Sequence, residues 1–144
     1  MSWAKLLGRY VTAEPPSKAE LDNLRSIVTR SLQDAVAPGL SADARFIMAY
    51  DAARTLSLIV VRSEGYRPRS VGGHYNTFLA IQEADPTFAT LSTYFDGCRM
   101  KRNGCEYDFA GGVSDTDADG LLKAVQQFKI DAEAWMKVHH PNLA

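Results

Sequence analysis

Hydrophobic residues recur every three or four positions over most of the chain, which is the spacing of one face of an α-helix. The first long stretch covers residues 17–40 and carries one apolar stripe, made by Leu21, Leu24, Val28, Leu32 and Ala35. Ser17, followed three residues later by Glu20, predicts a capping box at its start, and Pro38 with Gly39 predicts its end. We therefore expect an amphipathic helix that packs on the rest of the chain.

The next stretch begins at Ser41 and has apolar residues on two sides rather than one. One side carries Phe46, Tyr50, Ala53, Leu56 and Val60, and the other carries Ile47, Leu58 and Val61. A helix that is apolar on two faces is buried on two faces, so this segment is predicted to be the central helix of a bundle or a dimer interface. Gly65 predicts its end, and residues 66–69 are predicted to form a tight, basic connection.

Three more helices are predicted further along the chain. Their expected ranges are 72–81, 85–109 and 114–138. Pro86 suits the first turn of a helix, and Ser114 followed by Asp117 suits a helix cap. No segment shows a persuasive strand pattern. The sequence thus predicts an all-α fold, an up-down bundle of about five helices.

With 144 residues, the chain is long enough for one hydrophobic core but not for two independent ones. We expect a single domain over residues 1–144. Residues 1–16 would be an N-terminal extension that includes a docked helical turn, 17–40 an additional helix, and 41–139 the core bundle. No apolar stretch reaches 18 residues, which predicts neither a membrane span nor export. Cys98 and Cys105 are too far apart on a helix for a disulfide, so reduced thiols and a cytoplasmic location are expected.

The formal net charge of −1 argues against a protein that binds nucleic acid through its bulk charge. A local excess of positive charge is present in the middle third of the chain. Its cations are Arg62, Arg67, Arg69, Arg99, Lys101 and Arg102. Such side chains are the local candidates for contacts with phosphate. A solvated surface without a ligand fits the same residues.

Arg102 falls in the apolar stripe of the helix predicted over residues 85–109. That stripe consists of Leu91, Phe95, Cys98, Arg102, Cys105 and Phe109. A neighbouring face of the same helix carries Arg99, Arg102, Asn103, Glu106 and Tyr107. A guanidinium beside a core costs solvation energy unless a polar or anionic group meets it. Arg102 is therefore a candidate anion-binding residue, with two alternatives: its head reaches water, or it pairs with Glu106.

The string around Arg102 resembles the signature of the HEPN family of helical domains, in which an Arg and a polar residue precede a His. Arg102 and Asn103 match the start of that signature, and Tyr107 stands where the family has its His. The resemblance covers roughly residues 41–139. It includes the Ala-Tyr-Asp-Ala-Ala-Arg string at 49–54, a Gly-Gly-His-Tyr helix start and the order of the helices.

The resemblance implies metal-independent cleavage of RNA, or RNA binding, often as a toxin of a toxin-antitoxin pair and as a homodimer. The implied catalytic residues are Arg102, Asn103 and Tyr107, and the implied phosphate-binding residues are Arg99, Lys101, Arg67 and Arg69. Because a tyrosine is a poor base near neutral pH, Glu106 or His74 would have to replace the family's His.

The same residues are compatible with two other functions. One is a non-catalytic module that binds RNA, a nucleotide or a partner protein such as a nucleotidyltransferase-like antitoxin. The other is a purely structural homodimer whose polar face satisfies itself across the two-fold axis. Neither a metal nor a cofactor is expected. Residues 115–120 imitate the first half of an EF-hand loop, but Gln126 stands where the loop needs its bidentate glutamate.

Overall fold

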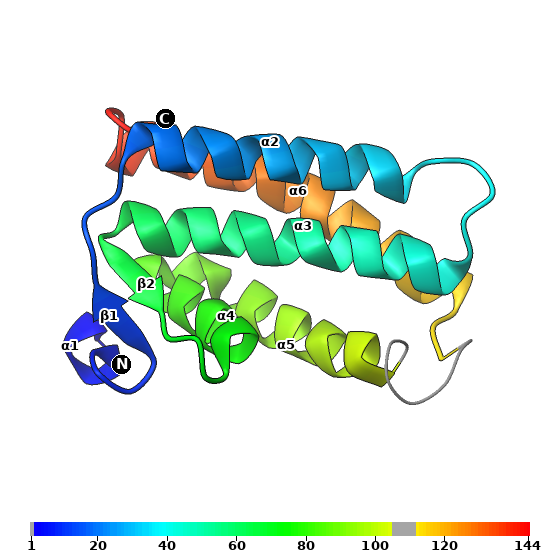
Figure 1. The fold of residues 1–144 in the computed structure, drawn as a ribbon, viewed down its shortest axis with the longest axis horizontal. Helices are drawn as coiled ribbons and strands as arrows, with labels where there is room; N and C mark the ends of the chain where they lie inside the picture. The colour runs from blue at the N-terminus through cyan, green and yellow to red at the C-terminus, as the bar shows by residue number, and fades with distance from the viewer. Residues whose placement is uncertain (1, 105–111) are drawn as a thin grey trace.

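The computed structural model describes residues 2–104 and 112–144, and Figure 1 shows their arrangement. In chain order the elements are α1 (Trp3–Leu6), β1 (Val11–Ala13), α2 (Lys18–Ala35), α3 (Ala42–Ser63), β2 (Tyr66–Pro68), α4 (Gly73–Ala84), the 3-10 helix η1 (Pro86–Phe88), α5 (Ala89–Asn103) and α6 (Asp115–His139). The predicted all-α bundle is confirmed, with α2 to α6 as its long helices. No helix of the described ranges combines the length and the apolar character that crossing a membrane requires.

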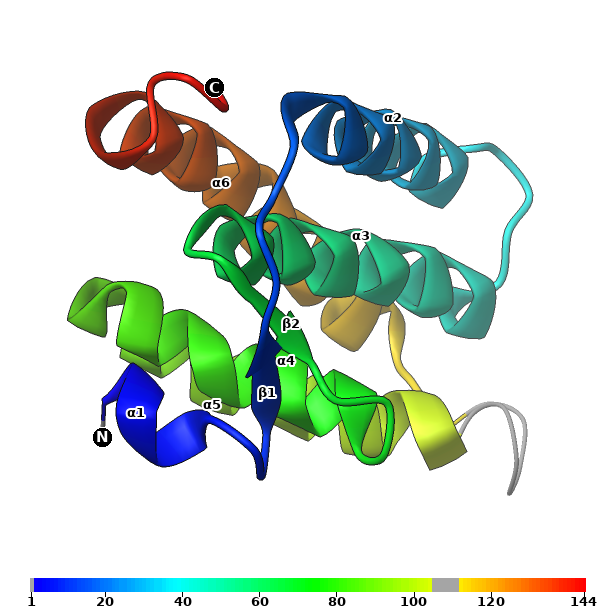
Figure 2. The ribbon, with the colours of Figure 1, turned by 60° about the vertical axis from the view of Figure 1, so that its left-hand side comes forward.

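Of the two roles predicted for the helix after Ser41, central helix or dimer interface, the central position is confirmed. Figure 1 and Figure 2 both show α3 between two helix pairs, with α2 and α6 on one side and α4 and α5 on the other. Buried residues follow α3 from Phe46 to Ser63 and lie on more than one of its faces. Ala49, Ala52 and Ala53 are fully buried, and their small side chains allow neighbouring helices to approach closely. Every other long helix therefore packs on α3.

The helix ends follow the predicted caps with two exceptions. Ser41 and Ser114 cap α3 and α6, and the second of these is a complete capping box with Asp117. Ser17 accepts the N–H of Glu20 at 3.2 Å, but the Glu20 carboxylate turns away to arginine side chains, so the predicted box at α2 is only half formed. The helix predicted from residue 85 begins as η1 and continues as α5 from residue 89; its predicted extension over 105–109 lies outside the described residues.

The predicted basic connection over residues 66–69 is wrong, because Tyr66–Pro68 forms the strand β2. It pairs antiparallel with β1, and Thr12 stands opposite Arg67 in the ladder. Trp3 of α1 stacks on Tyr66 with ring centroids 4.2 Å apart, which docks the N-terminal segment on the sheet. Strands of three residues are too short to show the alternation by which a strand is recognised in sequence.

A buried arginine fixes the start of α2 and the N-terminal segment to the end of α3. Arg62 is only 1% exposed, and its guanidinium donates to both carboxylate oxygens of Glu20, at 2.7 and 3.1 Å. Its other N–H groups donate to the backbone carbonyls of Glu14, Pro15 and Tyr66, at 2.9 to 3.0 Å. All five donors of the guanidinium are used. The buried charge is thus compensated by the hydrogen-bonded carboxylate of Glu20, by the Glu14 carboxylate at 3.4 Å and by three backbone dipoles.

Replacing Arg62 by methionine should lower the free energy of unfolding by about 3–5 kcal/mol, because the Glu20 carboxylate and the carbonyls lose their partner. The matched control is Arg67→Met, since Arg67 binds the same Glu20 at 3.0 Å but is 44% exposed. That change should cost less than about 1 kcal/mol. Urea unfolding followed by circular dichroism measures both. Equal losses in the two variants would contradict the role given to burial.

Stability should also fall at acid pH through Glu20. The hydrogen bond from Arg62 is the largest of the effects that hold the pKa of Glu20 below its usual value. A carboxylate with a lowered folded-state pKa stabilises the fold above its unfolded pKa, and this contribution is lost as the pH falls through the folded value. Glu20→Gln should therefore lose less stability than wild type between pH 7 and about pH 3. A pH profile for Glu20→Gln that is the same as that of wild type would exclude this role of Glu20.

Candidate functional site

Two residues predicted for the site meet on the ring of Tyr50. Tyr50 lies in α3 and is fully buried. His74, in the first turn of α4, has its Nδ1 2.9 Å from the Tyr50 hydroxyl. Arg102, near the end of α5, places its guanidinium carbon 5.4 Å from the centroid of the same ring, a cation–π distance. Three helices thus bring a phenol, an imidazole and a guanidinium together, and we call these three residues the Tyr50 cluster.

The Tyr50 phenol stays protonated despite the positive charges around it. Burial is the main cause, and it raises the pKa of Tyr50 far above its ordinary value. The positive charges of Arg102, Arg54 and Arg99 act in the opposite direction but do not overcome burial. A protonated hydroxyl can donate to His74 Nδ1 or accept from it, according to the tautomer of the ring. Either way, the contact fixes the orientation of the imidazole and leaves Nε2 outside the contact with Tyr50.

Arg99 lies one turn before Arg102 on α5 and belongs to the same cationic region. Its Nε donates to Asp96 at 2.7 Å, and its guanidinium carbon lies 5.8 Å from the ring centroid of Tyr75 on α4. The hydrogen bond to Asp96 is the main cause that raises the pKa of Arg99. Arg99 therefore remains charged, with its position set by a carboxylate on one side and a ring on the other.

The other predicted site residues are placed elsewhere or not described. Lys101 pairs with Asp117 of α6 at 3.0 Å. Arg67 binds Glu14 and Glu20, and Arg69 donates to the backbone carbonyl of Gly8. These last two side chains hold the N-terminal segment on β2. Asn103 is partly buried at the end of α5, whereas Glu106 and Tyr107 lie outside the described residues.

Sequence reasoning missed two residues of this region. Tyr50 occupies one position of the predicted apolar stripe, and its buried ring fits that role, but its hydroxyl is also a polar partner for His74. Arg54 is one turn further along α3, and its buried Nε has no hydrogen-bond partner within the described part of the chain. Both residues belong to the Ala-Tyr-Asp-Ala-Ala-Arg string at 49–54, which is the feature of the sequence that points to them.

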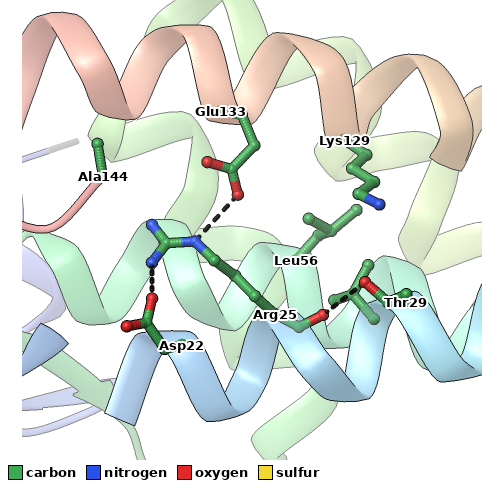
Figure 3. A pocket seen from close by; sticks show the side chains of 8 residues that line it. Asp22, Arg25, Thr29, Leu56, Lys129, Glu133 and Ala144 are labelled. Carbon is green, nitrogen blue, oxygen red and sulfur yellow. Dashed lines mark hydrogen bonds and ion pairs between the residues drawn. The ribbon is translucent and has the colours of Figure 1, made fainter. Parts of the chain in front are cut away.

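A separate cavity of about 320 Å³ lies between α2 and α6, as Figure 3 shows. Leu56 of α3 lines it together with charged side chains of both helices. Arg25 crosses it, with hydrogen bonds to Asp22 at 2.7 Å, Glu133 at 3.1 Å and the carbonyl of Leu143 at 2.7 Å. These hydrogen bonds join α2 to α6 and to the end of the chain, so the charged side chains that line this cavity have a structural role.

The Tyr50 cluster is therefore the arrangement best suited to chemistry. A guanidinium can receive an anion, and a histidine oriented by a third group can transfer a proton. Within the part of the chain that the structure describes, His, Cys, Asp and Glu side chains nowhere gather in a group of three that could hold a metal ion. Comparisons with protein-family models, with curated proteins and with solved structures find no match for this chain.

Proposed function

We propose that this protein is a HEPN-like, metal-independent ribonuclease whose Tyr50 cluster holds the scissile phosphate. The observation that carries the proposal is that one tyrosine contacts both groups: Arg102 lies over the ring of Tyr50, and His74 contacts its hydroxyl. The helix pattern predicts an anion-binding arginine at 102, but Tyr107 stands where the family pattern has its histidine. His74 supplies an imidazole to the same place from a different helix.

Each member of the cluster has a defined role in the proposed reaction. The ribose 2′-hydroxyl attacks the adjacent phosphorus, and the 5′-oxygen leaves as the bond to phosphorus breaks. Arg102 offers a fork of N–H donors to the phosphate oxygens as negative charge grows on them. His74 takes the proton of the 2′-hydroxyl through Nε2, and the leaving 5′-oxygen takes a proton from water. Tyr50 acts as a positioning residue, because its buried hydroxyl holds the imidazole through Nδ1.

The test is cleavage of a structured RNA in the presence of EDTA by wild type, Arg102→Ala and His74→Ala. We expect each variant to lose about 100-fold or more in rate, the usual effect of removing a transition-state donor or an acid–base group. Arg30→Ala, an exposed arginine of α2, is the matched control and should keep the wild-type rate. Thermal unfolding of each variant separates loss of activity from loss of fold. Equal rates in wild type and both variants would remove the proposal.

The same experiment distinguishes the ribonuclease from the second candidate function, a non-catalytic RNA-binding module. The observation that favours the module is the hydrogen-bond contact of His74 with a buried tyrosine, which also suits a structural histidine. A module would bind RNA in an Arg102-dependent manner without shortening it. Salt dependence of that binding would then identify the phosphate contact.

A homodimer is part of the same proposal. The family resemblance implies that the ends of two α5 helices, each with its Arg102, share one cleft. Light scattering of the purified chain should then give twice the 15.8 kDa of one chain. A monomer would remove the dimer from the proposal but not the Tyr50 cluster, because Tyr50, His74 and Arg102 come from a single chain.

A further inference from the structure

Aromatic rings and arginines alternate along a path that leads away from the Tyr50 cluster. Arg102 lies on Tyr50, and Arg99, three residues earlier on the same helix, lies on Tyr75 at 5.8 Å. Tyr75 meets Tyr10 of the N-terminal segment edge to face, with centroids 6.4 Å apart, and Arg9 lies 5.1 Å from the Tyr10 centroid. These contacts join the N-terminal segment, the first turn of α4 and the last turns of α5.

A cavity of about 200 Å³ opens beside this path, between α4 and α5. Its lining residues combine one aromatic ring and one leucine with four polar side chains: Tyr75, Leu79, Gln82, Ser92, Thr93 and Asp96. Tyr75 is 40% exposed, so part of its ring is accessible to a ligand. Gln82, Ser92 and Asp96 offer an amide, a hydroxyl and a carboxylate, which are the groups that hydrogen-bond the edges of nucleobases.

We propose that Tyr75 and the cavity between α4 and α5 bind one unpaired nucleobase of single-stranded RNA, next to the phosphate held by Arg102. This inference rests on the proposed function and adds the substrate class. Side chains three residues apart on a helix are neighbours, so Arg99 and Arg102 can contact adjacent phosphates of one strand. A base paired in a duplex keeps its faces stacked on its neighbours and is not available to Tyr75.

Charge and geometry favour a flexible strand over a duplex. Among the described residues, Arg99 donates a hydrogen bond to Asp96 through its Nε. Its two terminal nitrogens carry the donors that can bind phosphate oxygens. The negative charge of Asp96 weakens the attraction for phosphate at this point, so affinity here must come from stacking and base contacts. Stacking on an aromatic ring is tolerant of base identity, because every base has a π-face.

The experiment measures binding of a labelled mixed-sequence 12-mer of 2′-O-methyl RNA, which lacks the attacking hydroxyl, by fluorescence anisotropy. Tyr75→Leu should weaken single-strand binding about tenfold, the size expected for the loss of one stacked base. Tyr75→Phe should bind within about twofold of wild type, because it keeps the ring. The matched control is Tyr94→Leu: Tyr94 is also 40% exposed, but its hydroxyl points toward Gly120 of α6. The same 12-mer annealed to its complement should bind wild type and Tyr75→Leu equally.

The outcomes separate this inference from the function on which it rests. If Arg102→Ala weakens binding and Tyr75→Leu behaves like Tyr94→Leu, the nucleobase site is wrong and the phosphate site stands. An equal loss on single strand and duplex for Tyr75→Leu would also overturn the base site. If wild type binds neither RNA, the proposed function fails and this inference fails with it.

Discussion

Arg62 and its ring of acceptors connect the end of the central helix to the start of α2 and to the N-terminal segment. The guanidinium is anchored at the end of the central helix and reaches α2 through Glu20, and it reaches the N-terminal segment through the carbonyls of Glu14 and Pro15. A buried guanidinium tolerates few arrangements, since each unmet N–H would cost free energy. The register of the N-terminal segment on β2 is thereby restricted. That register also sets the position of Tyr10, whose ring contacts Tyr75 near the candidate site.

The candidate site depends on the central helix in a different way. α3 has helices on two sides, so a polar atom on it is buried and needs a partner from another element. The partner of the Tyr50 hydroxyl is His74, which lies in the first turn of α4. Arg102 then covers the ring from α5. One tyrosine on the most buried helix therefore determines where a histidine and an arginine from two other helices come together.

Periodicity and capping residues were sufficient to predict the bundle, because a helix is recognised from apolar residues three or four positions apart and from the residues at its ends. Ser41, Gly65 and Ser114 mark ends that the structure reproduces. Partners of charged side chains are not local. Arg67 and Arg69 were expected at a phosphate site because of their charge, yet they hold the N-terminal segment, which lies more than 50 residues earlier in the chain. For Arg102 the expected apolar surroundings are present, but the ring of Tyr50 could not be deduced from the helix pattern of α5 alone.

The most direct measurement of the central claim is the side-chain NMR spectrum of the labelled chain during titration with single-stranded 2′-O-methyl RNA. The account predicts saturable shifts of the Arg102 Nε–Hε resonance and of the His74 ring, at one common affinity. The Arg25 resonance, from the cavity between α2 and α6, should stay in place and serves as the internal reference. Saturable binding that moves Arg25 and leaves Arg102 and His74 unchanged would contradict the account.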